Sequence, residues 1–176
     1  MLLNMTYSCQ VWCDILGTSN TKGVFKMEYE IIEMAEKTVA GFSVRTNNSS
    51  PTMQSDIGGL WQRFFTPEGF FGLTNKVNEK ALGIYTDYEN DEKADYTLMT
   101  ACELTDENVG QQYEVRTIPA GKYAKFVVKG NMVTAVGEFW QKLWTMELDR
   151  SFVCDYEEYQ NADPDNCEIH IYIGLK

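Results

Sequence analysis

An internal duplication is the feature that most limits how this chain can fold. Tyr29–Arg45 reads YEIIEMAEKTVAGFSVR and Tyr113–Lys129 reads YEVRTIPAGKYAKFVVK, so the first residues of the two copies differ in number by 113 − 29 = 84. Two further pairs of segments recur in the same order: IGGLWQRFF (57–65) matches VGEFWQKLW (136–144), and TDYE (86–89) matches CDYE (154–157). A repeat of this length is too long for a solenoid. We therefore predict one domain, residues 27–176, made of two pseudo-symmetric halves at about 27–106 and 111–176.

Hydrophobic patterns within each half predict the order strand, helix, strand, strand. Ala40, Phe42 and Val44 alternate with small or polar residues, which is the period of a half-buried strand. A helix capped by Ser55 or Asp56 and running to about residue 65 would gather one apolar face. That face comprises Ile57, Leu60, Trp61, Phe64 and Phe65, and its counterpart comprises Val136, Phe139, Trp140, Leu143 and Trp144. Later strands are expected at 81–88, 96–104, 151–156 and 168–176. We expect an α+β fold in which duplicated β-α-β-β units form an antiparallel sheet with two long helices and a groove where the halves meet.

The composition of the chain excludes several classes of function. Its formal net charge is −11 and its pI is near 4.5, which argues against direct nucleic-acid binding, because phosphate contacts need clustered Lys and Arg. No apolar run is long enough to span a membrane. The five cysteines form no C-x-x-C pair and the single histidine is His170, so we expect no metal, no cofactor and no disulfide framework. A reduced, cytoplasmic protein is the expectation.

Residues 1–26 lie outside the repeat and form an extra N-terminal leader. They lack a basic n-region and an A-x-A-like cleavage site, so they are a poor signal peptide. Met27 stands just before the first strand and could be the start of the domain. A truncated chain that begins at Met27 and fails to fold would refute this hypothesis.

The order of the motifs resembles a known family. The segments YEVRTIPAGKYAKFVVKG, VGEFWQKLW, RSFVCDYEEY and EIHIYIGLK, together with NKVNEKALGIYTDYENDEKADYTLMTACEL in the first half, are similar to the GyrI-like family. This family is also called the bacterial transcription-activator, or AraC-type, effector-binding domain. The resemblance covers residues 27–176 and rests on several motifs in order.

The resemblance implies a duplicated β-α-β-β fold with an aromatic ligand cleft and a buried acidic residue between the halves. It implies a stand-alone module that captures lipophilic, cationic aromatic compounds, because no helix-turn-helix precedes the domain. Two alternatives stay open. One is a hydrolase of small strained, cyclopropanoid electrophiles that uses the same Glu, and the other is a gyrase-inhibitor-like module with a protein partner. A homodimer is also open.

Five residues are the candidates for the ligand site. Glu168 matches the family's acidic residue in its E-x-x-I-Y-I-type strand, and the alternative is a Glu at an exposed strand end. In a partly dry aromatic pocket a carboxylate would attract cations strongly, and as an enzyme it would be the acid or base. Trp61 and Trp140 are either cleft walls or core, while Tyr123 and Tyr172 are wall candidates.

Other polar residues are given structural roles. Strand alternation puts His170 on the face of Glu168 and Tyr172, as a hydrogen-bond partner or a surface histidine. The two DYE motifs are expected to end strands in both halves, with the tyrosine packed and the acids facing water.

Overall fold

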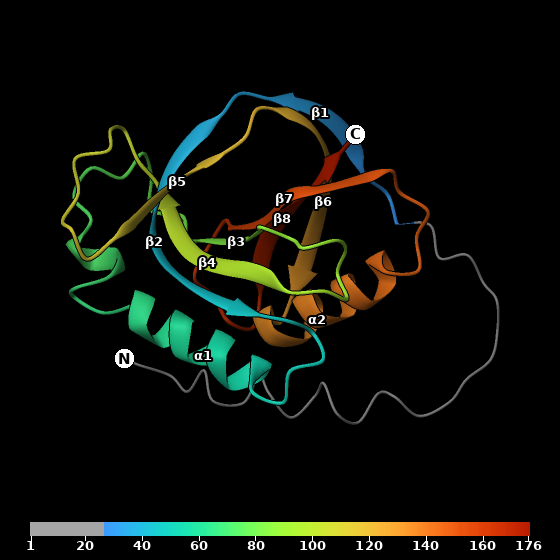
Figure 1. The fold of residues 1–176 in the computed structure, drawn as a ribbon, viewed down its shortest axis with the longest axis horizontal. Coiled ribbons are helices and arrows are strands. Elements are labelled where there is room, and N and C mark those ends of the chain that lie inside the picture. Colours follow the sequence, from blue (N-terminus) through green and yellow to red (C-terminus); the bar gives the residue numbers. More distant parts are fainter. Residues whose placement is uncertain (1–26) are drawn as a thin grey trace.

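The computed structural model describes residues 27–176, which form an eight-stranded antiparallel sheet with two helices packed on one of its faces (Figure 1). The strands lie in the order β1-β6-β8-β7-β3-β4-β2-β5. The elements are β1 (Glu30–Met34), β2 (Lys37–Thr46), α1 (Met53–Phe64), the short 3-10 helix η3 (Phe70–Gly72), β3 (Leu82–Thr86), β4 (Tyr96–Glu103), β5 (Glu114–Ile118), β6 (Gly121–Gly130), α2 (Met132–Leu143), β7 (Arg150–Tyr159) and β8 (Cys167–Leu175). The predicted α+β class with an antiparallel sheet and two helices is confirmed. The leader, 1–26, lies outside the described residues.

The segment before each helix forms two extended pieces around a bend, β1 and β2 in the first half and β5 and β6 in the second. Met34 lies opposite Gly121 and Lys37 lies opposite Ile118, so the same register runs through both pairings. The strands β1–β2 and β5–β6 therefore form one long antiparallel ribbon that bends at residues 35–36 and 119–120. Because β1 and β5 are the two edge strands, this ribbon joins the edges of the sheet and arches over the face opposite the helices (Figure 1). We call this face the arch face, and the other the helix face.

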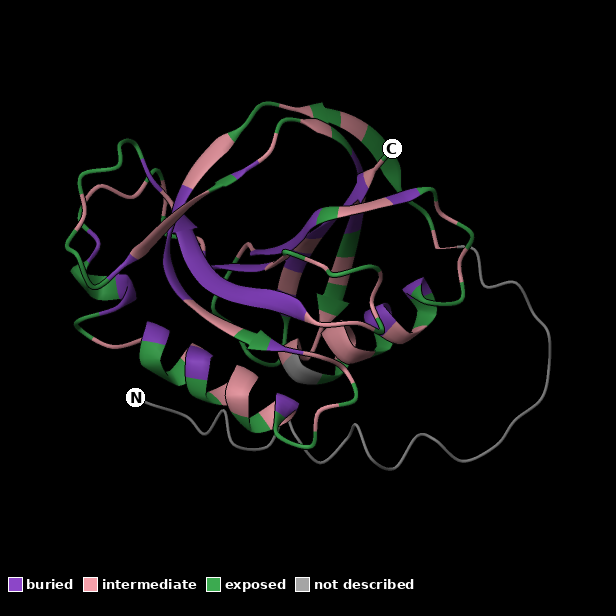
Figure 2. Cartoon of the chain, viewed as in Figure 1, coloured by how far each residue is buried: buried purple, intermediate pink, exposed green. Residues whose placement is uncertain are grey.

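Three hydrophobic cores follow from this curved shape. The first packs α1 on the sheet through residues that include Leu60 and Phe64, and the second packs α2 through residues that include Phe139 and Leu143. The third contains no helix residue and fills the arch, with Tyr123, Tyr156 and Tyr172 among its members. The interior strand β4 is buried along nearly its whole length because it is covered on both faces (Figure 2).

The helices match the predicted apolar faces, with two differences at their ends. The first helix begins at Met53, before the expected cap, with Thr52 as its N-cap residue. The Thr52 hydroxyl donates a 2.8 Å hydrogen bond to the Asp56 carboxylate, so Asp56 is part of the first turn and not the cap. Trp144 lies past the end of α2 and is 36% exposed. Neither described helix combines the length and apolarity that crossing a bilayer requires.

Candidate ligand-binding site

A buried carboxylate, that of Glu157, lies on the helix face at the centre of the sheet. Its Oε1 accepts hydrogen bonds from Trp140 Nε1 at 2.7 Å and from the Tyr85 hydroxyl at 2.8 Å. Its Oε2 accepts a bond of 2.8 Å from the Tyr159 hydroxyl. Glu157 is 2% exposed, and this burial raises its pKa despite the three hydrogen bonds, which act in the opposite direction. Burial and the Glu157 charge also raise the pKa of both tyrosines.

Aromatic rings from both helices enclose this carboxylate. The ring centroids of Tyr85 and Trp140 are 4.8 Å apart, and those of Trp61 and Tyr159 are 5.4 Å apart, each pair in an edge-to-face arrangement. A Cβ placed on Gly83 would lie 3.2 Å from Glu157 Oε2 and 3.2 Å from Trp61 Cζ2. The glycine at position 83 therefore leaves the space into which the carboxylate and the indole fit. We call Trp61, Tyr85, Trp140, Glu157 and Tyr159 the carboxylate cage.

The cage is nearly symmetric about the junction of the two halves. The strands β1 and β2 of the first half correspond to β5 and β6 of the second half. The pairing of β2 with β4 and of β4 with β3 matches the pairing of β6 with β8 and of β8 with β7. These matched registers make Tyr85 in β3 equivalent to Tyr159 in β7. The same relation pairs Gly83 with Glu157, which lie directly opposite each other on these two strands. Trp61 in α1 and Trp140 in α2 occupy equivalent positions in their two helices. The site thus contains two tryptophans, two tyrosines and one acid, with glycine in the place of the second acid.

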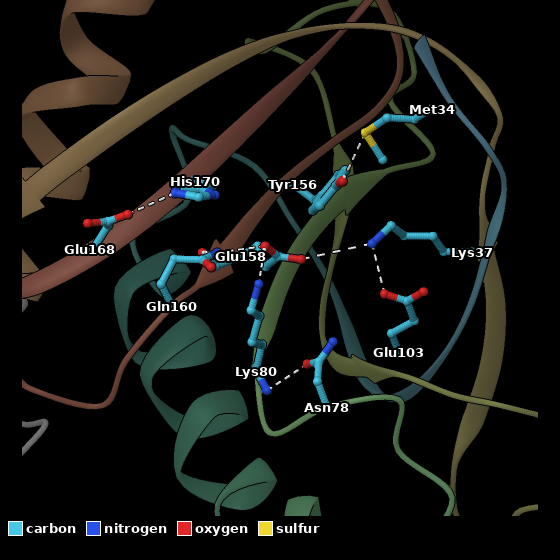
Figure 3. A network of polar contacts seen from close by, with 10 residues as sticks. All are labelled: Met34, Lys37, Asn78, Lys80, Glu103, Tyr156, Glu158, Gln160, Glu168 and His170. Atoms are coloured by element: carbon cyan, nitrogen blue, oxygen red, sulfur yellow. Dashed lines mark hydrogen bonds and ion pairs between the residues drawn. The ribbon is translucent and has the colours of Figure 1, made fainter. Parts of the chain in front are cut away.

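Three acids of β7 are buried, and Glu157 differs from the other two in its partners. Asp155, on the same face, forms a 2.7 Å ion pair with Arg150. Glu158, on the arch face, is bonded at 3.0 Å by Lys80 and approached at 3.9 Å by Lys37 (Figure 3). Burial acts to raise the pKa of Glu158, but the Gln160 and Lys80 bonds outweigh it and lower that pKa. Within the described residues, the hydrogen-bond donors to Glu157 are all uncharged, so this charge alone has no compensating cation.

The structure separates the five predicted site residues. Trp61 and Trp140 lie in the cage, whereas Tyr123 and Tyr172 lie in the core of the arch face. Glu168 stands near the start of β8 on the arch face with its side chain 35% exposed, so the expectation that it is the buried acid is not met. Figure 3 shows its contact with His170, at 3.0 Å, and it also forms a 2.8 Å ion pair with Lys129. Its pKa is lowered, first by the Lys129 bond and then by the His170 bond.

The second DYE motif is the part of the site that sequence reasoning missed. Asp155, Tyr156 and Glu157 lie inside β7, and both acids are buried, which contradicts the expectation that they end a strand and face water. In the first half Asp87 and Glu89 are exposed beyond the end of β3, as expected. The two motifs match in letters but not in space, because the registers place Gly83, and not Glu89, at the position equivalent to Glu157. In the described chain, no group of three or more His, Cys, Asp or Glu side chains is arranged to hold a metal.

Comparisons with known proteins agree with this architecture. The model of the family described as Cass2, integron-associated effector binding protein, matches residues 30–175. The integron cassette protein VCH_CASS2 from the mobile metagenome of Vibrio cholerae is 27% identical, with a TM-score of 0.69 over 84% of this chain and 95% of that chain. No curated protein matches the chain.

Two less similar structures share the fold. SAV2435, solved bound to tetraphenylphosphonium, is 22% identical with a TM-score of 0.71, covering 85% of this chain and 94% of that chain. The C-terminal domain of EcmrR is 15% identical with a TM-score of 0.52, covering 85% of this chain and 97% of that chain. The duplicated halves, the antiparallel sheet and the family match over residues 30–175 lead to one conclusion: the chain belongs to the integron-associated effector-binding proteins of the GyrI-like superfamily, which bind small molecules.

Proposed function

We propose that the protein captures lipophilic aromatic cations in the carboxylate cage, with Glu157 rather than Glu168 as the charged residue. The observation that carries this proposal is the difference among the three buried acids of β7. Asp155 and Glu158 have cations of the chain itself beside them, and Glu157 has only neutral donors among the described residues. A buried charge without a counter-ion is costly, so a ligand that brings a positive charge relieves that cost.

The aromatic members of the cage suit lipophilic aromatic cations. Faces of Trp and Tyr attract cations by about 0.5–2 kcal/mol each, and more strongly when water is excluded. Trp61, Tyr85 and Tyr159 are only partly buried, so the cage is not sealed from solvent, and the Trp61 ring stacks on Phe65 at 5.7 Å. A ligand would reach Glu157 by displacing this ring. The structure of SAV2435 with tetraphenylphosphonium supports the ligand class, since that protein shares the fold.

The test is a titration of tetraphenylphosphonium followed by the fluorescence of the tryptophans. We expect wild-type affinity on the order of micromolar, about −8 kcal/mol. The substitution Glu157→Gln keeps the size of the side chain and removes its charge, so it should weaken binding by at least about tenfold, or ~1.4 kcal/mol. Triphenylphosphine oxide, which is similar in shape but neutral, should bind the variant and the wild type equally.

The matched control is Glu168→Gln, which removes a partly exposed acid on the opposite face of the sheet. It should leave tetraphenylphosphonium binding unchanged. If Glu168→Gln abolishes binding while Glu157→Gln does not, the ligand site is on the arch face and the proposal is wrong.

A further inference from the structure

A cavity opens on the arch face, on the other side of the sheet from the carboxylate cage. It has a volume of about 260 Å³ and is lined by Val39, Ile84, Thr86, Asp87, Arg116, Thr117, Ile118 and Cys154. Ile84 and Tyr85 are consecutive in β3, so their side chains point to the cavity and to the cage respectively. Pockets for drug-sized ligands are larger than this cavity. It therefore suits a molecule smaller than a typical drug.

The floor of the cavity is apolar and its rim is charged. Val39, Ile84, Ile118 and Cys154 are each at most 3% exposed. At the rim, Arg116 bonds Asp87 through Nη1 and Glu114 through Nε. Within residues 27–176 its Nη2 makes no hydrogen bond, so Arg116, which lines the cavity, keeps a donor for an anionic group.

The position of Asp87 is fixed from two sides. Its φ of 50° is in the left-handed region, which few residues other than glycine adopt. Arg45 donates a hydrogen bond to its main-chain carbonyl, and Arg116 binds its carboxylate. The Arg116 bond lowers the pKa of Asp87 and keeps it ionised. The rim thus presents one positive and one negative group in a set geometry above an apolar floor.

We propose that this cavity binds a small zwitterion with an aliphatic tail, the chemistry of an aliphatic α-amino acid. The ligand's carboxylate would pair with Arg116 and its ammonium with Asp87, while the tail would contact Ile84 and Ile118. A zwitterion suits the rim better than an anion does, because the chain carries a net charge of −11. The site is independent of the carboxylate cage and of its proposed ligand.

Methyl NMR of the full chain tests this assignment with L-leucine as the probe. Leucine should shift the methyl signals of Ile84 and Ile118 and leave those of Ile57 and Ile171, on the helix face, unchanged. Two analogues separate the charges: 4-methylpentanoate lacks the ammonium and isopentylamine lacks the carboxylate. Both should bind at least about tenfold more weakly than leucine. The absence of shifts with leucine in large excess, or equal binding of either analogue, would overturn the proposal.

A variant and a second measurement complete the test. Arg116→Gln should weaken leucine binding at least about tenfold, whereas the exposed Lys122→Gln should not. If Arg116→Gln does not fold, the site can still be tested in the wild type by measuring how fast its cysteines are alkylated. Saturating leucine should slow alkylation of Cys154, which lines the cavity, and should not slow that of Cys102, which is buried in the α1 core. Equal rates at Cys154 with and without leucine would refute the site.

Discussion

Glu157 and Glu158 are neighbours in the sequence, yet β7 turns their side chains to opposite faces with opposite electrostatic surroundings. Gln160 and Lys80 bond Glu158 and lower its pKa, whereas the neutral donors around Glu157 do not offset the effect of burial. Ionising Glu157 is therefore less favourable than ionising an ordinary glutamate, and a bound cation would offset that cost. This difference between adjacent residues gives each acid a separate role, one in the arch core and one in the cage.

The raised pKa of Glu157 predicts that cation binding depends on pH. Because the folded-state pKa lies above the ordinary value of 4.5, the folded protein binds this proton at a pH where the unfolded chain has lost it. Binding of tetraphenylphosphonium should be full above the raised pKa and should be lost as the pH falls through it. Titrations carried out at successively lower pH, starting from neutral pH, would show this loss.

The raised pKa of Glu157 also predicts that the stability of the protein depends on pH. This second dependence provides a control for the binding experiment. The free energy of unfolding should fall as pH rises between the unfolded and folded pKa of Glu157, since the folded state holds more protons there. Glu157→Gln should remove this slope and unfold at no lower urea concentration than wild type near neutral pH. Its residual cation binding should not change with pH in that window. A strong pH dependence that survives in Glu157→Gln would assign the effect to another group.

The Asp155–Arg150 pair predicts the opposite result, a large loss of stability when one partner is removed. Both side chains are almost fully buried, at 0% and 7% exposed, and Asp155 also accepts bonds from the Tyr88 hydroxyl and the Gly174 amide. Arg150→Met leaves the acid without its cation, so it should lower the free energy of unfolding by about 3–5 kcal/mol. Urea denaturation measures this change.

The exposed Lys129–Glu168 pair is the matched control for Arg150→Met. Lys129 is 66% exposed, so Lys129→Met should change stability by at most about 1 kcal/mol. Similar losses for Lys129→Met and Arg150→Met would show that burial does not decide the value of these pairs.

At the scale of elements, α1 carries two glycines that its packing does not require. A Cβ placed on Gly58 or Gly59 would meet nothing within 4 Å. Glycine in a helix costs about 0.5–1 kcal/mol relative to alanine. We expect Gly59→Ala to raise the free energy of unfolding by about that amount, as measured by urea denaturation.

Gly41 in β2 provides the contrast. There a Cβ would lie 1.8 Å from the main-chain oxygen of Thr100, so Gly41→Ala should destabilise the protein. A stabilising effect of Gly41→Ala, or a destabilising one of Gly59→Ala, would contradict this interpretation of the two glycines.

The elements whose apolar residues recur with a clear period are predictable from the sequence. Ile57, Leu60 and Phe64 define the face of α1 that packs on the sheet. Their counterparts Val136, Phe139 and Leu143 define the same face of α2. The strand β7 is harder to predict because Cys154–Glu158 are buried on both faces, so its pattern has no alternation. Without that alternation the DYE motif resembles a strand end, and its acids are wrongly predicted to face water.

The location of the acid does not follow from the resemblance alone. Glu168 occupies the start of a strand with the family's pattern. Because side chains alternate along β8, however, Glu168 lies on the arch face with His170 and Tyr172. A shift of one residue moves a side chain to the other face of a sheet. What distinguishes the buried Glu157, the proposed acid, is its register against Gly83, and this register depends on the fold of both halves.

For the whole molecule, the bent ribbon makes the two halves depend on each other. Every strand pairing of β1 and β5 is with the other half, and β3 pairs with β7 at the centre of the sheet. Separate chains of 27–106 and 111–176 should therefore each lack a cooperative unfolding transition, while their mixture should recover one. Circular dichroism during thermal unfolding measures this. A cooperative transition in either half alone would contradict the dependence.

The pairing of Gly83 with Glu157 also bears on how such a site can arise. In a dimer of two identical halves these positions would hold the same residue on either side of the symmetry axis. Two glutamates there would repel each other, and two glycines would leave no charge. A single acid on the axis therefore requires two halves that differ in sequence, and a chain that carries both halves can hold a different residue at each of the two positions.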